Sequence, residues 1–125
     1  MKTGAYLLIL KVKAQNLVIG ALGELDFKSG YYVYVGSAMN GLKARLDRHR
    51  SKHKRMHWHI DYLLDKAELV EILSFPDKLK RECEFSRKVS ETADSEVKDF
   101  GCSDCSCNSH LYYFRSFPKH LHSLS

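Results

Sequence analysis

Three stretches rich in tyrosine, leucine and β-branched residues occupy much of the first 36 positions and constrain the fold most. They span residues 5–13 (AYLLILKVK), 17–27 and 31–36 (YYVYVG), with turn-forming residues between them. Such composition, bounded by turn residues, is typical of β-strands. Because the connections are short, we predict an antiparallel three-stranded meander, with Gly20 and Gly23 breaking the middle strand by a bulge or bend.

Helical spacing replaces this pattern in the rest of the chain. Leu42, Leu46 and His49 share one face of a helix that Asn40 is placed to cap. Composition and spacing predict four further elements: a helix over 58–65, a strand over 69–75, a long helix from Pro76 to about Thr92 and a strand over 110–115. We expect an α/β fold with a small, mainly antiparallel central sheet, the meander plus extra strands, flanked by helices.

The length of 125 residues suits one domain, and 44% hydrophobic with 28% charged residues excludes intrinsic disorder. We assign 1–117 to a single domain and expect 118–125 to be a flexible C-terminal tail. The longest apolar runs are far shorter than the roughly 20 residues that span a bilayer. No signal peptide is recognisable, so we expect a cytoplasmic protein without a membrane partner.

The net charge of +5 is concentrated in one segment. Residues 43–55 contain seven Lys or Arg and one acidic residue, whereas the remainder is nearly neutral. Such a patch indicates an anionic partner, and DNA is the expected one. Beside Arg45, the candidate nucleic-acid-binding residues are Lys43, Arg48, Arg50, Lys52, Lys54 and Arg55.

Four side chains are candidates for chemistry, each with a plainer alternative. Glu82 lies within the expected apolar stripe of Leu79, Cys83, Ser86, Val89 and Ala93, where a carboxylate needs a cation or an arginine. Alternatively, it borders the stripe and reaches solvent. Arg45 would bind a phosphate or belong to a solvated helix face. Tyr6 and Tyr34 would act in catalysis or be core aromatics.

Together these residues resemble the GIY-YIG nuclease family. Gly4-Ala5-Tyr6 and Tyr34-Val35-Gly36 are similar to the two signatures, and Leu42–His49 resembles the Leu-x-x-Arg-Leu-x-x-His helix after the second. Glu82-Cys83-Glu84-Phe85 resembles the stretch with the family's metal-binding glutamate. The blocks GYYVYVGSA (30–38), HWHIDYLL (57–64) and SDCSCNSHL (103–111) resemble a prokaryotic branch, some of whose members are joined to a DNA-glycosylase-type repair enzyme.

This resemblance implies a metal-dependent endonuclease, with a DNA-repair enzyme as a candidate protein partner. Glu82 would hold Mg²⁺ or Mn²⁺, and Arg45 would neutralise the scissile phosphate. Tyr6 or Tyr34 would position, and deprotonate, the attacking water, and His49 would assist.

The cysteines suggest a second metal. Cys102, Cys105, Cys107 and His110 offer four zinc ligands in nine residues, and Cys83 is an alternative ligand that the branch resemblance favours over Cys102. Buried thiols are the other interpretation. His57 and Asp61 have a helical ligand spacing, but we favour packing by Trp58 and Ile60, with His57 and His59 lining the nucleic-acid face or satisfying the core.

Three functions therefore compete: a metal-dependent DNA endonuclease acting in repair, a catalytically inactive nucleic-acid-binding module that uses the 43–55 patch, and a structural or partner-binding domain. Salt-sensitive DNA binding separates the third from the others.

Overall fold

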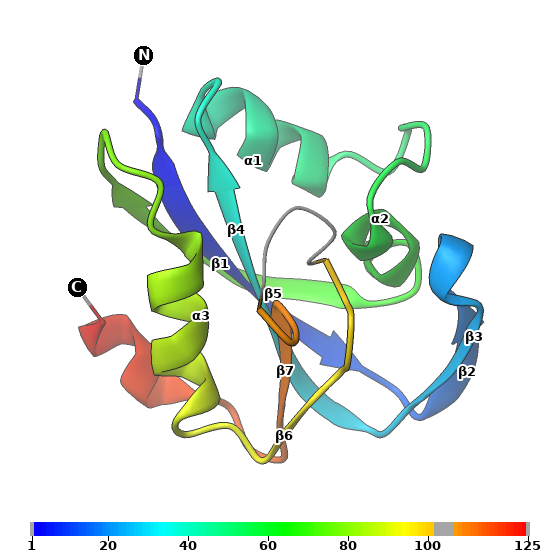
Figure 1. The fold of residues 1–125 in the computed structure, drawn as a ribbon. Coiled ribbons are helices and arrows are strands. Elements are labelled where there is room, and N and C mark those ends of the chain that lie inside the picture. The colour runs from blue at the N-terminus through cyan, green and yellow to red at the C-terminus, as the bar shows by residue number, and fades with distance from the viewer. Residues whose placement is uncertain (1, 102–106, 125) are drawn as a thin grey trace.

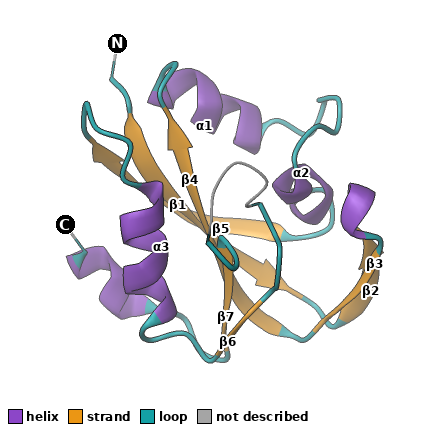
Figure 2. Ribbon diagram, viewed as in Figure 1, coloured by secondary structure: helices purple, strands orange, loops and turns teal. Residues whose placement is uncertain are grey.

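The computed structural model describes residues 2–101 and 107–124 (Figures 1 and 2). Its centre is a five-stranded sheet in which neighbouring strands are antiparallel, in the order β5-β1-β4-β7-β6. The strands are β1 (Gly4–Val12), β4 (Gly30–Ala38), β5 (Glu68–Pro76), β6 (Ser95–Glu96) and β7 (Leu111–Phe114). The predicted α/β class with a mainly antiparallel sheet is confirmed.

The segment expected to supply the middle strand of a meander folds apart from this sheet. β1 pairs directly with β4, and Val12 lies opposite Gly30. The residues between them form a separate hairpin of β2 (Gln15–Val18) and β3 (Glu24–Phe27), with the 3-10 turn η1 (Gly20–Leu22) at its tip. The chain does turn at Gly20 and Gly23, as predicted, but the segment that contains them lies outside the five-stranded sheet. Ile19 and Phe27 remain buried, so the hairpin covers one end of the core.

The sheet has a hydrophobic core on each face because its side chains alternate along the strands. Tyr6, Leu8 and Leu10 of β1 face the helices α1 (Leu42–Arg50) and α2 (His59–Leu64) together with the hairpin. The intervening β1 residues face α3 (Glu82–Ser90) and the C-terminal turn η2 (Lys119–Ser123). Figure 1 shows this separation, with α3 and α1 on different sides of the central strands.

Two helix starts differ from the prediction. α3 begins at Glu82, five residues after Asp77, because β5 runs to Pro76 and the next residues form a turn in which Asp77 accepts a hydrogen bond from the Leu79 N–H. Leu79 is 69% exposed and lies outside the buried stripe, which contains Phe85, Ser86 and Val89. In α1 the N-cap is Gly41 without a side-chain cap, so Asn40 does not cap the helix.

The described part of the C-terminal segment, residues 118–124, packs on the sheet, which differs from the expectation of a flexible tail after residue 117. Leu121 on η2 is 1% exposed and joins the core formed with Phe85 and Val89. Leu121 and Pro118 supply the buried apolar surface that holds this segment.

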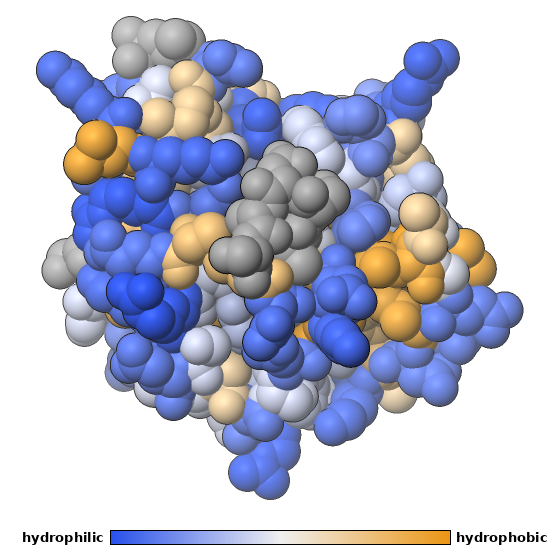
Figure 3. Space-filling model, viewed as in Figure 1, coloured by the Kyte–Doolittle hydropathy of each residue, from blue (hydrophilic) through white to orange (hydrophobic). Residues whose placement is uncertain are grey.

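The surface is mostly hydrophilic on the face in Figure 3, and its largest hydrophobic area lies beside the β2–β3 hairpin. Val18 of this hairpin is 60% exposed. Within 2–101 and 107–124, no helix has the length and apolarity needed to span a bilayer.

Candidate active site

The predicted catalytic residues Tyr6, Tyr34, Arg45 and Glu82 line one pocket of about 380 Å³. They come from β1, β4, α1 and α3, which are far apart in the sequence. The other described lining residues are Ser37, Met39, Asn40, His57, Trp58, His59, Lys80, Gly101 and His110. The structure therefore brings together the residues that the sequence analysis grouped for catalysis.

Two glycines of the signature segments allow β1 to approach its neighbours closely, Gly36 on the β4 side and Gly4 at the end of β5. Tyr6 lies opposite Gly36 across the β1–β4 pair, and a Cβ at Gly36 would collide with the Tyr6 ring and hydroxyl. Gly4 has φ +149°, and a Cβ there would meet the backbone of Phe75 and Asp77. The rings of Tyr6 and Tyr34 lie 6.4 Å apart, centroid to centroid, at the pocket wall.

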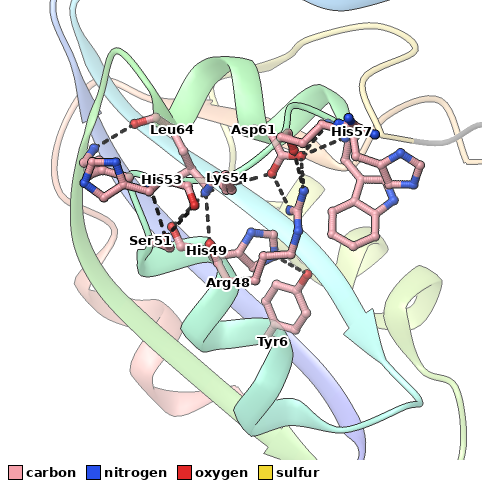
Figure 4. A network of polar contacts seen from close by, with 12 residues as sticks. Tyr6, Arg48, His49, Ser51, His53, Lys54, His57, Asp61 and Leu64 are labelled. Carbon is pink, nitrogen blue, oxygen red and sulfur yellow. Dashed lines mark hydrogen bonds and ion pairs between the residues drawn. The ribbon is translucent and has the colours of Figure 1, made fainter.

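Tyr6 forms a buried hydrogen bond with His49, whose Nε2 lies 2.7 Å from the phenol oxygen (Figure 4). Burial raises the pKa of Tyr6 to about 12 and, with a smaller contribution from Lys54, lowers the pKa of His49 to about 3. Burial also raises the pKa of Tyr34 well above its ordinary value. Both partners of the hydrogen bond are therefore neutral at pH 7, and His49 reaches the site through Tyr6.

Arg45 is held at the pocket by contacts on both its polar and its flat surfaces. Its Nη1 donates a 3.0 Å hydrogen bond to the Ser37 carbonyl, and its guanidinium carbon lies 4.3 Å from the centroid of a Trp58 ring. The guanidinium carbon of Arg48 lies 4.4 Å from the centroid of a Trp58 ring. This stacking orients Arg45 while leaving donors for an anion in the pocket.

Glu82 occupies the first turn of α3, and 17% of its side chain is exposed. Of the described residues that line the pocket, it alone carries a carboxylate, and Lys80 Nζ lies 3.2 Å from its Oε1. One carboxylate in a pocket wide enough for water suits Mg²⁺, which keeps several water ligands. Glu82 is therefore the carboxylate in this pocket that could hold a divalent cation, and Lys80 would have to move aside for it.

The basic segment does not form one continuous free surface. Lys54 Nζ, on a side chain that is 9% exposed, donates to the Arg48 and His49 carbonyls at the C-terminus of α1. Lys52 donates to the Leu64 carbonyl at the end of α2. Exposed Lys43 and Arg50 both pair with Asp47, and Arg55 is also exposed.

Arg48 is committed to a buried carboxylate. It donates two hydrogen bonds, of 2.7 and 2.9 Å, to Asp61, which is 0% exposed and also accepts the backbone N–H groups of His57 and Trp58 (Figure 4). Burial opposes ionisation of Asp61, but these hydrogen bonds outweigh it and lower the pKa. Both carboxylate oxygens are engaged in these contacts, and Ile60 and Trp58 pack in and against the core, as the packing interpretation expects.

A second group of ligands adjoins the pocket. Cys83, Cys107 and His110 each place a ligand atom within 4.8 Å of the others, so the group could hold a metal ion. Burial lowers the pKa of His110, which favours the neutral imidazole that metals bind. The predicted ligands Cys102 and Cys105 lie outside the described residues.

Several lining residues were not predicted as site residues. The spacing predicts Lys80 inside a helix, whereas α3 begins two residues after it, so no periodicity identifies it as a site residue. Trp58 was expected only to pack, although a tryptophan close to a basic helix is a signal for stacking with arginine. His59, left between two roles, accepts a 2.9 Å hydrogen bond from the Gly101 N–H and lines the pocket.

The sequence model of a family described as a domain of unknown function, DUF123, matches residues 5–125. Comparisons with curated proteins and with solved structures give no match. Because the matched region extends from the first tyrosine strand through the packed C-terminal turn, the chain belongs to the DUF123 family.

Proposed function

We propose that the protein is a metal-dependent endonuclease that hydrolyses DNA phosphodiester bonds, with a role in DNA repair. The observation that carries the proposal is the meeting of Tyr6, Tyr34, Arg45 and Glu82 in one pocket. The resemblance of these residues to those of GIY-YIG nucleases supports the reaction type. The basic helix α1 at the pocket edge supports an anionic polymer as substrate.

Arg45 is the proposed phosphate ligand. Its guanidinium is permanently charged and planar, and Trp58 and the Ser37 carbonyl fix its orientation. A pre-oriented cation stabilises the charge that develops on phosphorus without reorganising during the reaction.

Tyr6 and His49 are proposed to act as one unit that orients the attacking water. With a pKa of about 12, the Tyr6 phenol is protonated at neutral pH and is a poor isolated base. If the Tyr6 hydroxyl donates its hydrogen bond to His49 Nε2, the phenol oxygen can still accept a hydrogen bond from water. Tyr34 forms the adjoining wall and limits where that water can lie.

Glu82 is the proposed ligand of Mg²⁺ or Mn²⁺. When bound, the cation supplies Lewis acidity that stabilises the leaving oxygen. Lys80 balances the carboxylate in the cation-free protein, and its flexible side chain allows it to turn toward the phosphate backbone.

A catalytically inactive nucleic-acid-binding module is the second candidate. The raised pKa of both tyrosines and the ion pair between Lys80 and Glu82 favour it, since a pocket in this state can bind a phosphate without cleaving it.

Cleavage assays on supercoiled, nicked, branched and single-stranded DNA with Mg²⁺, Mn²⁺ or EDTA test the proposal. We expect metal-dependent cleavage whose rate falls about 10²–10³-fold in Glu82→Gln and in Arg45→Lys, because each change removes charge or geometry used in the transition state. The matched control is Glu84→Gln. Glu84 lies in the same helical turn but pairs with Arg81 and Lys88 outside the pocket.

The binding and cleavage readouts separate the candidates. Metal-dependent cleavage that Glu84→Gln retains and Glu82→Gln loses supports the nuclease. DNA binding without cleavage of any substrate supports the binding module. Absence of salt-sensitive DNA binding would contradict both and leave a structural or partner-binding domain.

A further inference from the structure

The cysteine–histidine group joins two segments that meet at the wall of the pocket. Cys83 is in the first turn of α3, and Cys107 and His110 precede β7. The sulfurs of the two cysteines are 2.8 Å apart, and a ring nitrogen of His110 is within 4.8 Å of both. His110 is buried, whereas the cysteines are half-buried, which leaves the group reachable by an ion.

The backbone around these ligands is fixed by contacts that do not involve their ligand atoms. The His110 N–H donates to the Phe100 carbonyl, and its carbonyl accepts the Val35 N–H, so strand β4 holds it. Ser86 of α3 donates a 3.0 Å hydrogen bond to the Ser109 carbonyl. Because Ser86 lies three residues after Cys83, this bond places Cys83 near Cys107 before any ion binds.

We propose that Cys83, Cys107 and His110 bind one zinc ion, a site distinct from the Glu82 carboxylate. Two thiolates and an imidazole are soft and intermediate donors that select zinc over Mg²⁺. Two sulfurs bound to one zinc at about 2.3 Å and the tetrahedral angle are about 3.8 Å apart. The distance between the Cys83 and Cys107 sulfurs would therefore grow by about 1 Å from its present 2.8 Å, and both thiols would lose their protons on binding. A water molecule can fill the fourth position of the tetrahedral zinc.

A disulfide between the two cysteines is the competing outcome. It requires the sulfurs to approach to about 2.05 Å. Such a bond would make no use of His110, which has a ring nitrogen within 4.8 Å of both sulfurs. The imidazole is therefore the feature that favours a metal.

The zinc site would also position Glu82, a consequence that rests on the proposed nuclease function. Cys83 directly follows Glu82 in the first turn of α3, and His110 lines the same pocket. An ion that joins Cys83 to His110 would fix the start of α3 against β7, and with it the Glu82 carboxylate. Cys83 and Cys107 are thus positioning residues.

Zinc content and cobalt spectra of the purified full chain test the site without any activity assay. We expect about one zinc per chain after dialysis. Cobalt substitution should give thiolate-to-metal charge-transfer absorption and the visible bands of a tetrahedral site. Cys83→Ser and Cys107→Ser should lose both, while Glu82→Gln and the control Ser90→Ala, at the far end of α3, should keep them. Chelation of the wild type should lower its Tm by at least about 5 °C, reversed by zinc.

If a cysteine variant folds poorly, the chelated wild type still allows the zinc-bound and zinc-free proteins to be compared. A metal-free chain whose mass is lower by two hydrogens, with no zinc uptake after reduction, overturns the proposal in favour of a disulfide. Zinc that disappears in Glu82→Gln also overturns it, because the ion would then be in the pocket.

The positioning of Glu82 by the zinc site is tested through activity. Removal of zinc by chelation, or Cys83→Ser, should weaken activation of cleavage by Mn²⁺ at least about tenfold, and zinc should restore it in the wild type. If the chain binds zinc but cuts no DNA, the site stands and the nuclease proposal fails.

Discussion

At the residue scale, burial decides the chemistry of the Tyr6–His49 pair more than any nearby charge. Desolvation is the largest contribution to the shifted pKa of each residue, and it acts in opposite directions because a phenol ionises to an anion and an imidazole to a cation. The result is a neutral hydrogen bond across the sheet–helix interface that keeps both rings in place (Figure 4).

His49 should make the fold sensitive to mild acid. Its pKa is about 3 in the folded chain and about 6.5 in the unfolded chain, so the unfolded state binds more protons between these values. Stability is therefore fully present above pH 6.5 and is lost as the pH falls, by about 2 kcal/mol at pH 5. Urea unfolding at pH 7 and pH 5 measures this loss, and His49→Gln should reduce it.

The control is His122, whose pKa is raised by hydrogen bonds to the Lys119 carbonyl and to Glu71. Its effect has the opposite sign, so His122→Gln should keep the full loss between pH 7 and pH 5. Equal pH dependence of His49→Gln and the wild type would show that His49 is not the residue that titrates.

The site residues were predictable where a motif fixed them and unpredictable where only the fold did. Tyr6, Tyr34, Arg45 and Glu82 belong to signature segments, so their grouping could be predicted without geometry. Lys80 enters the pocket from a turn that depends on where β5 ends, and no local pattern marks that point. Lys54 and Arg48 are used inside the fold because of the carbonyls and the Asp61 carboxylate that lie near them in space, and the sequence does not show these neighbours.

At the element scale, α3 carries the metal-ligand candidates Glu82 and Cys83 in its first turn, and its buried face forms part of the core on one side of the sheet. The expected helix was too long because Asp77 and Leu79 continue a helical spacing, whereas pairing of β5 with β1 through Pro76 outweighs that local preference. The misplaced middle strand has a similar cause. Residues 17–27 have strand composition, and only the direct pairing of β1 with β4 determines that they form a hairpin elsewhere.

Phe85 should be the residue that docks α3. Its ring is 0% exposed and stacks on Phe75 with 4.6 Å between centroids. Phe85→Ala should lower the free energy of unfolding by about 3–5 kcal/mol, and Phe85→Leu by much less. Leu79→Ala should change it by less than about 0.5 kcal/mol, since Leu79 is exposed. Urea denaturation compares the three variants. A similar loss of unfolding free energy in Phe85→Ala and Leu79→Ala would show that Leu79 is buried with the apolar face of α3.

At the scale of the whole molecule, the positive charge is divided between holding the fold and facing solvent. Arg48 joins α1 to Asp61 of α2, Lys54 donates to the last carbonyls of α1, and burial lowers the pKa of Lys54. Lys43, Arg50 and Arg55 extend from the same segment into solvent. The local charge of the sequence therefore overstates the surface available to a phosphate backbone.

This division predicts how DNA binding responds to salt. Arg55→Gln should lower the slope of log affinity against log salt by about one unit, because one phosphate contact is lost. Lys54→Gln should leave the slope unchanged and lower the stability of the fold. Fluorescence anisotropy of labelled DNA at several salt concentrations measures both slopes, and equal slopes for the two variants would contradict the division.

The stacking of arginine on Trp58 has an experimental consequence. The chain has one tryptophan, and it lies at the pocket wall in contact with the guanidinium groups of Arg45 and Arg48. A phosphate that draws Arg45 toward itself changes the surroundings of that indole and of no other. We therefore expect the intrinsic tryptophan fluorescence to change when a phosphate enters the pocket, which can be measured with unlabelled nucleic acid and unaltered protein.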